Sequence, residues 1–169
     1  MLITLDGVST PIVLNNCDAL LPPFAAVLGS WPFQRLDNIG SSQTAGAISV
    51  NREVHGYRIA SPWLDRPLVE RSEVGAVFSV IAELARAFVE ENPERLCLHC
   101  AAVEADGRLL IFPNTEEAGK STLAVKLASY GFRIFADDVL PLCEKSSKGT
   151  SLGIAPRLRL PLPSTADAV

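Results

Sequence analysis

Apolar residues recur at intervals of three and four between positions 74 and 88, a spacing that places them on one face of an α-helix. The series consists of Val74, Val77, Phe78, Ile81, Leu84, Ala85 and Phe88. Ser72 stands where an N-cap belongs, and Pro93 follows the last turn. The pattern therefore predicts a long amphipathic helix from Glu73 to Asn92, which we expect to separate an N-terminal subdomain from the rest of the chain.

The residues before this helix form short apolar segments separated by Gly, Pro and Asn. They predict strands over 1–5 and 12–14, a short helix near 19–28, a hairpin of 45–51 and 54–60, and a polar loop over 37–44. Pro22 and Pro23 confine the short helix to the residues that follow them. We expect residues 1–93 to form a small subdomain of mixed α/β structure.

The residues after the long helix alternate between strand and helix patterns. Strands are predicted over 96–105 and 109–112, a loop over 113–119, a helix over 120–130, and strands over 132–136 and 139–142. Asp106-Gly107 predicts a tight turn between the first two strands, and Gly131 stands at the C-cap of the helix. Residues 94–169 are therefore expected to form a second domain of α/β class.

Composition narrows the range of functions. The chain has 169 residues, of which 48% are hydrophobic and 20% charged, and its net charge is −4. This balance excludes a disordered chain and a coiled coil, and it gives no electrostatic reason to expect nucleic acid as a partner. No apolar run reaches the ~18 residues of a membrane span, and the N-terminus lacks the basic start of a signal peptide. We expect a cytoplasmic protein, without a membrane partner, whose four cysteines are reduced.

The segment 113–122, which reads PNTEEAGKST, lies between a predicted strand and a predicted helix. A strand that runs into a loop ending in Gly-Lys-Ser at a helix start is typical of a phosphate-binding site, because backbone N–H groups there face the anion. In such a loop Lys120 reaches the terminal phosphates, Ser121 holds Mg²⁺ and Thr122 contacts a phosphate. A Gly-Lys-Ser-Thr tetrapeptide can occur by chance, so the interpretation as a phosphate-binding loop depends on the strand before it and the helix after it.

Two acidic residues, Asp137 and Asp138, follow the strand that comes after this helix. Seventeen positions separate Lys120 from Asp137, which is room for one helix, a turn and a strand. In a parallel sheet both carboxylates would emerge at the same edge as the phosphate loop. One could bind Mg²⁺ there, and the other could accept the proton of an attacking hydroxyl. The alternative is a solvated turn without function.

Together these residues resemble the ATP-binding core of the HPr serine kinase/phosphorylase family. The resemblance covers residues 98–142: a histidine early in a strand (LHCAAVEADG), the Gly-Lys-Ser loop, a Tyr-Gly-Phe-Arg turn and a strand ending in Ala-Asp-Asp (FRIFADDV). It implies a P-loop kinase-like core of the phosphoenolpyruvate-carboxykinase type within residues 94–169, with ATP and Mg²⁺ as cofactors. It also implies transfer of the γ-phosphoryl group to a hydroxyl of a protein or peptide, and assembly into a homo-oligomer.

The resemblance also implies a role for each matching residue. Lys120 would contact the β- and γ-phosphates, Asp138 would activate the acceptor hydroxyl, and His99 would act beside the phosphates. Ser121 and Asp137 would hold Mg²⁺ or its water shell. The phosphates would lie along the whole loop, which consists of Asn114, Thr115, Glu116, Glu117, Ala118, Gly119, Lys120, Ser121 and Thr122.

The loop departs from the family pattern at three positions. Asn114 and Glu117 stand where the family has glycine, and a glutamate with positive φ costs on the order of 1 kcal/mol. Glu116 and Glu117 also place negative charge beside the expected triphosphate, at a cost of ~1–4 kcal/mol each at close range. The chain ends before further motifs of the family, so we expect a truncated or reduced core. These features favour an alternative function, that of a non-catalytic relative that binds a protein or peptide. A third possible function is binding of a nucleotide without transfer of its phosphoryl group.

Cys97 and Cys100 flank His99 and so invite a metal or redox interpretation. Structural zinc needs about four ligands, however, and a strand directs these two thiols to opposite faces. We therefore interpret both cysteines as buried small apolar residues. Without the family spacing, His99 would be interpreted as an ordinary strand-end histidine.

Overall fold

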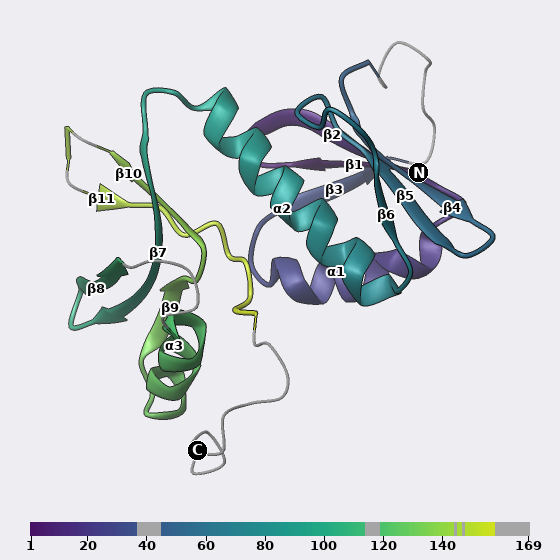
Figure 1. The fold of residues 1–169 in the computed structure, drawn as a ribbon. Coiled ribbons are helices and arrows are strands. Elements are labelled where there is room, and N and C mark those ends of the chain that lie inside the picture. Colours follow the sequence, from purple (N-terminus) through teal and green to yellow (C-terminus); the bar gives the residue numbers. More distant parts are fainter. Residues whose placement is uncertain (37–44, 114–118, 144, 147, 158–169) are drawn as a thin grey trace. The chain divides into compact units, whose positions relative to one another are not determined.

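The computed structural model describes residues 1–36, 45–113, 119–143, 145–146 and 148–157. Within these ranges the chain is a mixed α/β protein with two β-sheets and three α-helices (Figure 1). It divides into two compact units. The first comprises residues 1–26 and 31–93, and the second comprises Val27–Ser30 with the residues from Glu94 onward. None of the described helices has the length and apolar character needed to cross a membrane.

The first unit is built on a six-stranded sheet. Its elements are β1 (Leu2–Leu5), β2 (Val8–Asn15), the 3₁₀ helix η1 (Asp18–Leu20), α1 (Leu21–Leu28), β3 (Phe33–Leu36), β4 (Ile48–Glu53), β5 (Gly56–Ala60), β6 (Leu68–Glu70) and α2 (Glu73–Glu91). The last two residues of α1 belong to the second unit. The strand order is β3-β1-β2-β4-β5-β6, in which β2 and β4 are parallel and the other neighbours antiparallel. The predicted hairpin of β4 and β5 is confirmed, whereas the parallel pair and the short strands β3 and β6 were not predicted.

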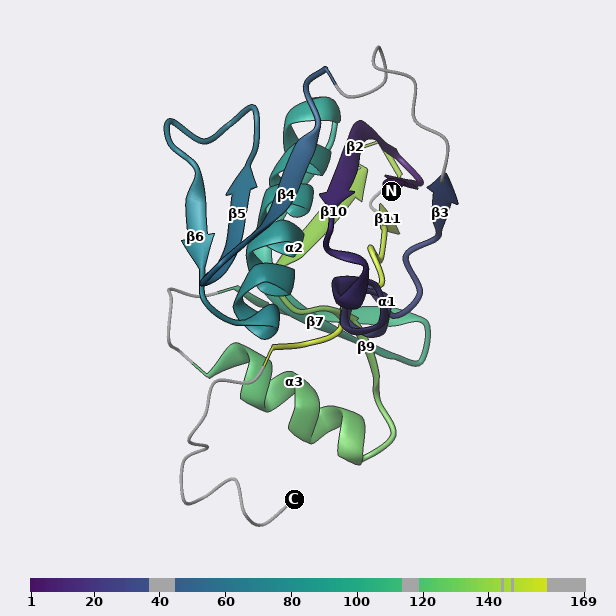
Figure 2. The same cartoon turned by 90° about the vertical axis from the view of Figure 1, so that its right-hand side faces the viewer.

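Helix α2 packs against β2, β4, β5 and β6 of this sheet (Figure 2). Ser72 caps it as predicted, because its hydroxyl oxygen accepts a hydrogen bond from the N–H of Gly75 at 3.0 Å. Val77, Leu84 and Phe88 of the predicted apolar face are buried. Val74 is an exception: it lies in the first turn and is 63% exposed, so the apolar stripe begins one turn later than the sequence suggests.

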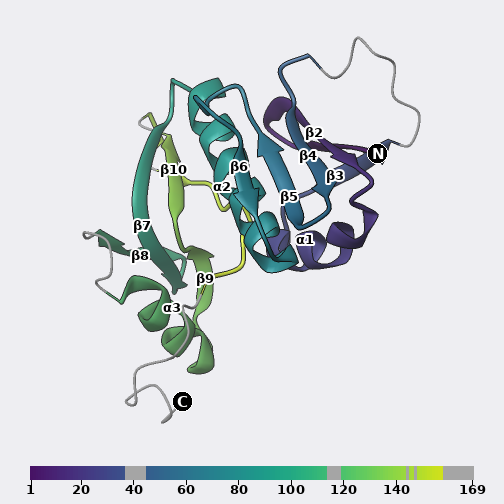
Figure 3. The ribbon, with the colours of Figure 1, turned by 45° about the vertical axis from the view of Figure 1, so that its right-hand side comes forward.

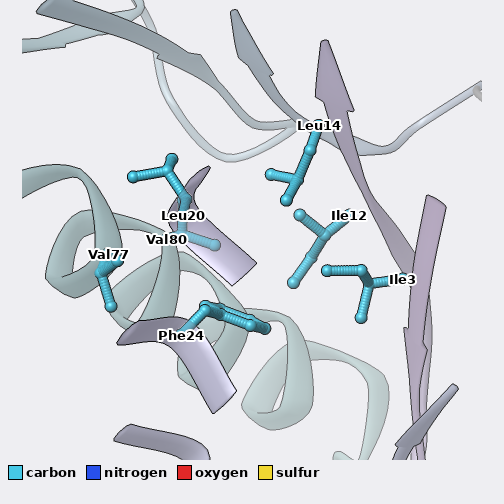
Figure 4. Close-up of a pocket in the computed structure, with 7 residues that line it drawn as sticks. All are labelled: Ile3, Ile12, Leu14, Leu20, Phe24, Val77 and Val80. Atoms are coloured by element: carbon cyan, nitrogen blue, oxygen red, sulfur yellow. The ribbon is translucent and has the colours of Figure 1, made fainter. Parts of the chain in front are cut away.

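The core of this unit lies between the sheet and its helices. Ile3, Ile12 and Ile48 of the central strands are completely buried there. The packing leaves one small apolar cavity of about 10 Å³ (Figure 4). Its lining consists of Ile3, Ile12, Leu14, Leu20, Phe24, Val77 and Val80. A space of this size holds at most one water molecule and offers it no polar partner, so we interpret it as a packing void.

The second unit is built around one long strand, β7. Its elements are β7 (Leu96–Ala105), β8 (Arg108–Pro113), α3 (Lys120–Ser129), β9 (Arg133–Ala136), β10 (Val139–Cys143) and β11 (Lys148–Gly149). The turn between β7 and β8 consists of Asp106 and Gly107, with φ of 51° and 72°. Two successive residues with positive φ form the type of turn that matches the twist of a hairpin, so the Asp-Gly prediction is confirmed.

The expected parallel sheet is wrong, because β8 and β9 are not neighbours. Both pair antiparallel with β7 over residues 102–104, so β7 lies between them (Figure 3). They therefore run in the same direction, and both end beside the middle of β7: Pro113 pairs with Cys100, and Ala136 with Ala102. The loop after β8 and the acidic pair after β9 thus leave the sheet at one edge, as expected.

Helix α3 covers one face of β7. Ala124 of the helix packs against Ala101 and Val103, while the opposite face of the strand carries Cys100 and Ala102. The helix ends as predicted at Gly131, whose φ is +89°. The N–H of Gly131 donates to Ala128 at 2.9 Å and that of residue 132 to Leu127 at 3.2 Å, which is the Schellman pattern.

Candidate functional site

Helix α3 begins where the sequence predicts the end of a phosphate loop. Gly119 is its N-cap with φ of +78°, a left-handed conformation that favours glycine, and Lys120 is its first residue. Such a helix start presents unpaired N–H groups and partial positive charge. Gly119, Lys120, Ser121 and Thr122 are the predicted loop residues that the structure describes; Asn114, Thr115, Glu116, Glu117 and Ala118 lie outside the described residues.

The acidic pair lies between β9 and β10, beside the strand that carries the histidine. Strand β10 pairs with the first half of β7, with Val139 opposite His99. The N–H of Cys100 donates a hydrogen bond to the backbone oxygen of Asp138 at 3.1 Å. The change of partner along β7, from β9 to β10, thus holds Asp137 and Asp138 against His99 and Cys100.

His99 and Asp138 form a direct pair. Nδ1 of His99 lies 3.0 Å from Oδ1 of Asp138, and the side chains are 56% and 59% exposed. A hydrogen bond from Nδ1 to a carboxylate fixes the orientation of the ring and leaves Nε2 as the other functional nitrogen. Both side chains of the pair are more than half exposed, so solvent reaches them.

Asp137 has different surroundings, although it is the next residue. Its Oδ2 accepts a hydrogen bond from the backbone N–H of Arg157 at 2.9 Å. Its Oδ1 is buried and has no hydrogen-bond partner among the described residues. Burial raises the pKa of Asp137, while the Arg157 N–H, the Ser121 hydroxyl and the charge of Lys120 act in the opposite direction. The carboxylate is thus within electrostatic reach of both residues that open α3.

Lys120 lies close to the same edge of the sheet. Burial raises the pKa of the Cys100 thiol, and the positive charge of Lys120 opposes this shift. Cys100 is completely buried, whereas Cys97 is only partly buried, contrary to the prediction for Cys97; both thiols are free. A buried thiol with a raised pKa is a poor nucleophile and a poor metal ligand. The interpretation of Cys100 as a core residue therefore agrees with its position.

The donor set fits a magnesium ion that shares its coordination with phosphate. Ser121 and Asp137 offer a hydroxyl and a buried carboxylate oxygen that lacks a partner among the described residues. Mg²⁺ prefers oxygen ligands, keeps several waters and usually takes only one or two carboxylates plus phosphate oxygens. The described residues contain no cluster of three His, Cys, Asp or Glu side chains that could hold a metal.

The structure brings together five residues that the sequence singled out, namely His99, Lys120, Ser121, Asp137 and Asp138. It adds one contact that the sequence did not indicate, the backbone N–H of Arg157. A backbone donor leaves no signature in the residue type, so only the path of the chain reveals it.

Comparison with known proteins gives no relative for this chain. No protein-family model matches it, and neither a curated protein nor a solved structure shows significant similarity to it. Conclusions about function therefore depend on the geometry of the described site.

Proposed function

We propose that this chain is an ATP-dependent, Mg²⁺-assisted kinase that resembles the HPr serine kinase/phosphorylase family and has a P-loop type of core. It would transfer the γ-phosphoryl group of ATP to a hydroxyl of a protein or peptide. One observation carries the proposal: Lys120 and Ser121 open a helix within electrostatic reach of Asp137, and the neighbouring Asp138 is paired with His99. This combination suits phosphoryl transfer, because the catalysis of that reaction is mainly positioning and charge neutralisation.

Each residue would act on a different part of the reaction. The ammonium of Lys120 and the N–H groups at the start of α3 would bind the β- and γ-phosphates. Ser121 and Asp137 would hold Mg²⁺, which when bound neutralises part of the phosphate charge. Asp138, oriented by His99, would accept the proton of the attacking hydroxyl. The oxygen of that hydroxyl would bond to the γ-phosphorus as the bond to the bridging oxygen breaks and ADP leaves.

The test is calorimetric titration of the full chain with ATP, with and without Mg²⁺. We expect binding that depends on Mg²⁺ and that Lys120→Ala weakens at least tenfold, the minimum for loss of a charge-assisted phosphate contact. Lys126→Ala is the matched control, because Lys126 lies in the last turn of the same helix, away from its N-terminus. A folded wild-type chain that binds no ATP at millimolar concentration would overturn the kinase proposal.

A second candidate, a non-catalytic module that binds a protein or peptide, is favoured by the composition of the loop. Asn114 and Glu117 stand where the family has glycine, and the charges of Glu116 and Glu117 repel a triphosphate. The calorimetric experiment separates the candidates. Absence of ATP binding supports the module, Mg²⁺-dependent binding followed by transfer to a hydroxyl supports the kinase, and binding without transfer to any acceptor supports a nucleotide binder. Cytoplasmic location and assembly into a homo-oligomer belong to the kinase proposal.

A further inference from the structure

The segment from Thr150 to Arg157 is anchored at regular intervals along the second unit. The N–H of Thr150 donates to the carbonyl of Pro141 at 2.9 Å. The carbonyl of Gly153 then accepts from the N–H of Ser30 at 3.2 Å, and the N–H of Ala155 donates to the carbonyl of Val27 at 2.7 Å. Leu152 is buried between these anchors. The segment is therefore fixed along its described length and does not simply trail away from β11.

The last described contact of this segment is made with the candidate site. The N–H of Arg157 reaches Oδ2 of Asp137 at 2.9 Å. Pro156 stabilises this arrangement, because proline fixes its own φ and holds the preceding residue in an extended conformation. The contact makes the two oxygens of Asp137 unequal: Oδ2 is occupied by the N–H, whereas Oδ1 is buried without a partner among the described residues.

We infer that residues 150–157 form a strap whose terminal N–H, that of Arg157, is a positioning group for the carboxylate of Asp137. The significance of this strap for Mg²⁺ rests on the proposed function, but the contact itself does not. By holding Oδ2, the strap acts together with the Ser121 hydroxyl, which also hydrogen-bonds to this carboxylate, and so orients Oδ1 for a ligand. Arg157 thus acts through Asp137 and through its backbone, so its contribution to positioning does not depend on the identity of its side chain.

The contact itself is tested by hydrogen exchange of the Arg157 amide, measured by NMR on the full chain. We expect a protected amide in the wild type and at least tenfold faster exchange in Asp137→Ala. Asp138→Ala is the matched control, since that carboxylate pairs with His99 and not with the strap. Equal exchange rates in the wild type and Asp137→Ala would overturn the inference. This measurement requires no nucleotide, so it separates failure of the strap from failure of the proposed function.

The positioning effect is tested by removing the N–H donor of residue 157. Arg157→Pro eliminates this donor, and Arg157→Ala is the reference, because both variants lack the guanidinium and only one lacks the N–H. We expect Mg²⁺-dependent ATP binding to be roughly tenfold weaker in Arg157→Pro than in Arg157→Ala, as is common for groups that orient a metal ligand. Equal affinities in the two variants would exclude a positioning role.

A second variant displaces the strap from a distance. Gly29 has φ of +57°, and a Cβ there would lie 2.7 Å from the carbonyl oxygen of Gly153, which is backbone and cannot move aside alone. Gly29→Ala is therefore expected to raise the exchange rate of the Arg157 amide and to weaken Mg²⁺-dependent binding without altering any site residue. Unchanged exchange and unchanged binding in a folded Gly29→Ala protein would contradict the strap. If the wild type binds no ATP, the proposed function fails and the exchange rates alone decide the inference.

Discussion

Asp137 and Asp138 are adjacent in the sequence, but their carboxylates have different surroundings. Carboxylates in different surroundings can take different roles. The two residues form the bend between β9 and β10, so their side chains enter different surroundings. Asp138 is half exposed and pairs with His99, while the Oδ1 atom of Asp137 is buried and the pKa of that carboxyl is raised by burial. An exposed carboxylate with a fixed partner suits proton transfer, and a buried oxygen without a partner suits a cation. The division of labour in the proposed reaction follows from these surroundings.

Glu91, the last residue of α2, illustrates a carboxylate with a purely structural effect. Its two oxygens accept hydrogen bonds from the backbone N–H and the hydroxyl of both Ser9 and Thr10, for example at 2.8 Å from the Ser9 hydroxyl and 3.0 Å from the Thr10 N–H. Partial burial alone would raise the pKa of Glu91, but these hydrogen bonds outweigh it and lower the pKa. Glu91→Gln, which loses the charge, is expected to lower the free energy of unfolding by about 1–3 kcal/mol at neutral pH.

The pH dependence of this effect has a definite sign. Because the pKa of Glu91 is lowered on folding, its stabilisation is present above the ordinary glutamate pKa and is lost as the pH falls through the folded value. Urea unfolding at pH 7 and in the acid range measures the difference between wild type and Glu91→Gln, which should shrink on acidification. Glu90→Gln is the control, because Glu90 is exposed on the same turn. An equal loss in both variants, or a difference independent of pH, would contradict this account.

At the scale of elements, the C-terminus of α3 depends on one glycine. Gly131 has φ of +89°, and a Cβ there would meet no atom within 4 Å. Gly131→Ala is therefore destabilising because of the backbone conformation and not because of a steric clash. We expect the left-handed conformation of alanine to lower the free energy of unfolding by about 1 kcal/mol. Gly131→Asn should recover part of it, because asparagine tolerates this region. Thermal unfolding measures both variants; a full loss in the asparagine variant would argue for a steric cause instead.

Elements whose signals are local could be predicted from the sequence, and those that depend on distant pairing could not. Ser72, Asp106-Gly107 and Gly131 act within a few residues of themselves, and the predicted cap, turn and helix end are all present. The parallel pairing of β2 with β4 joins segments more than thirty residues apart, and no local pattern encodes it. The prediction of a parallel sheet was wrong for the same reason. Strand β7 lies between β8 and β9, and the periodicity of apolar residues does not reveal which strands pair.

The site shows the same division between local and distant signals. Lys120, Ser121, Asp137 and Asp138 could be selected because their motifs follow a strand and a helix in a fixed order. His99 required a resemblance, because one histidine in a strand carries no signal of its own. The N–H of Arg157 could not be predicted, since every residue except proline has this donor and only the folded path places it on Asp137.

For the whole molecule, the two units differ in the side chains that form their cores. The core of the first unit contains large aliphatic residues such as Ile12, Ile48 and Leu84, all at 0% exposure. The two core clusters described in the second unit bury mainly small residues, namely Cys100, Ala101, Ala102, Val103, Ala124 and Ala136, with Leu140 as the large one. Leu152 is also buried, whereas other large apolar side chains of this unit, among them Leu109 and Phe135, are only partly buried. Because stabilisation follows the apolar area removed from water, we expect the second unit to be the less stable.

Hydrogen exchange along the chain tests this difference and links it to ligand binding. In the absence of ligand, amides of β7, β9 and β10 should exchange at lower urea concentration than those of β2, β4 and α2, because regions with less buried apolar surface open more easily. A ligand that binds only the folded second unit stabilises it by about 2.7 kcal/mol at a hundred times its Kd. ATP with Mg²⁺ should therefore slow exchange in the second unit and leave the slowest amides of the first unchanged. If the phosphates bind at α3, Lys120→Ala should abolish the slowing of exchange by ATP with Mg²⁺. Uniform slowing of exchange across both units would instead indicate that ATP binds elsewhere or that the two units unfold as one.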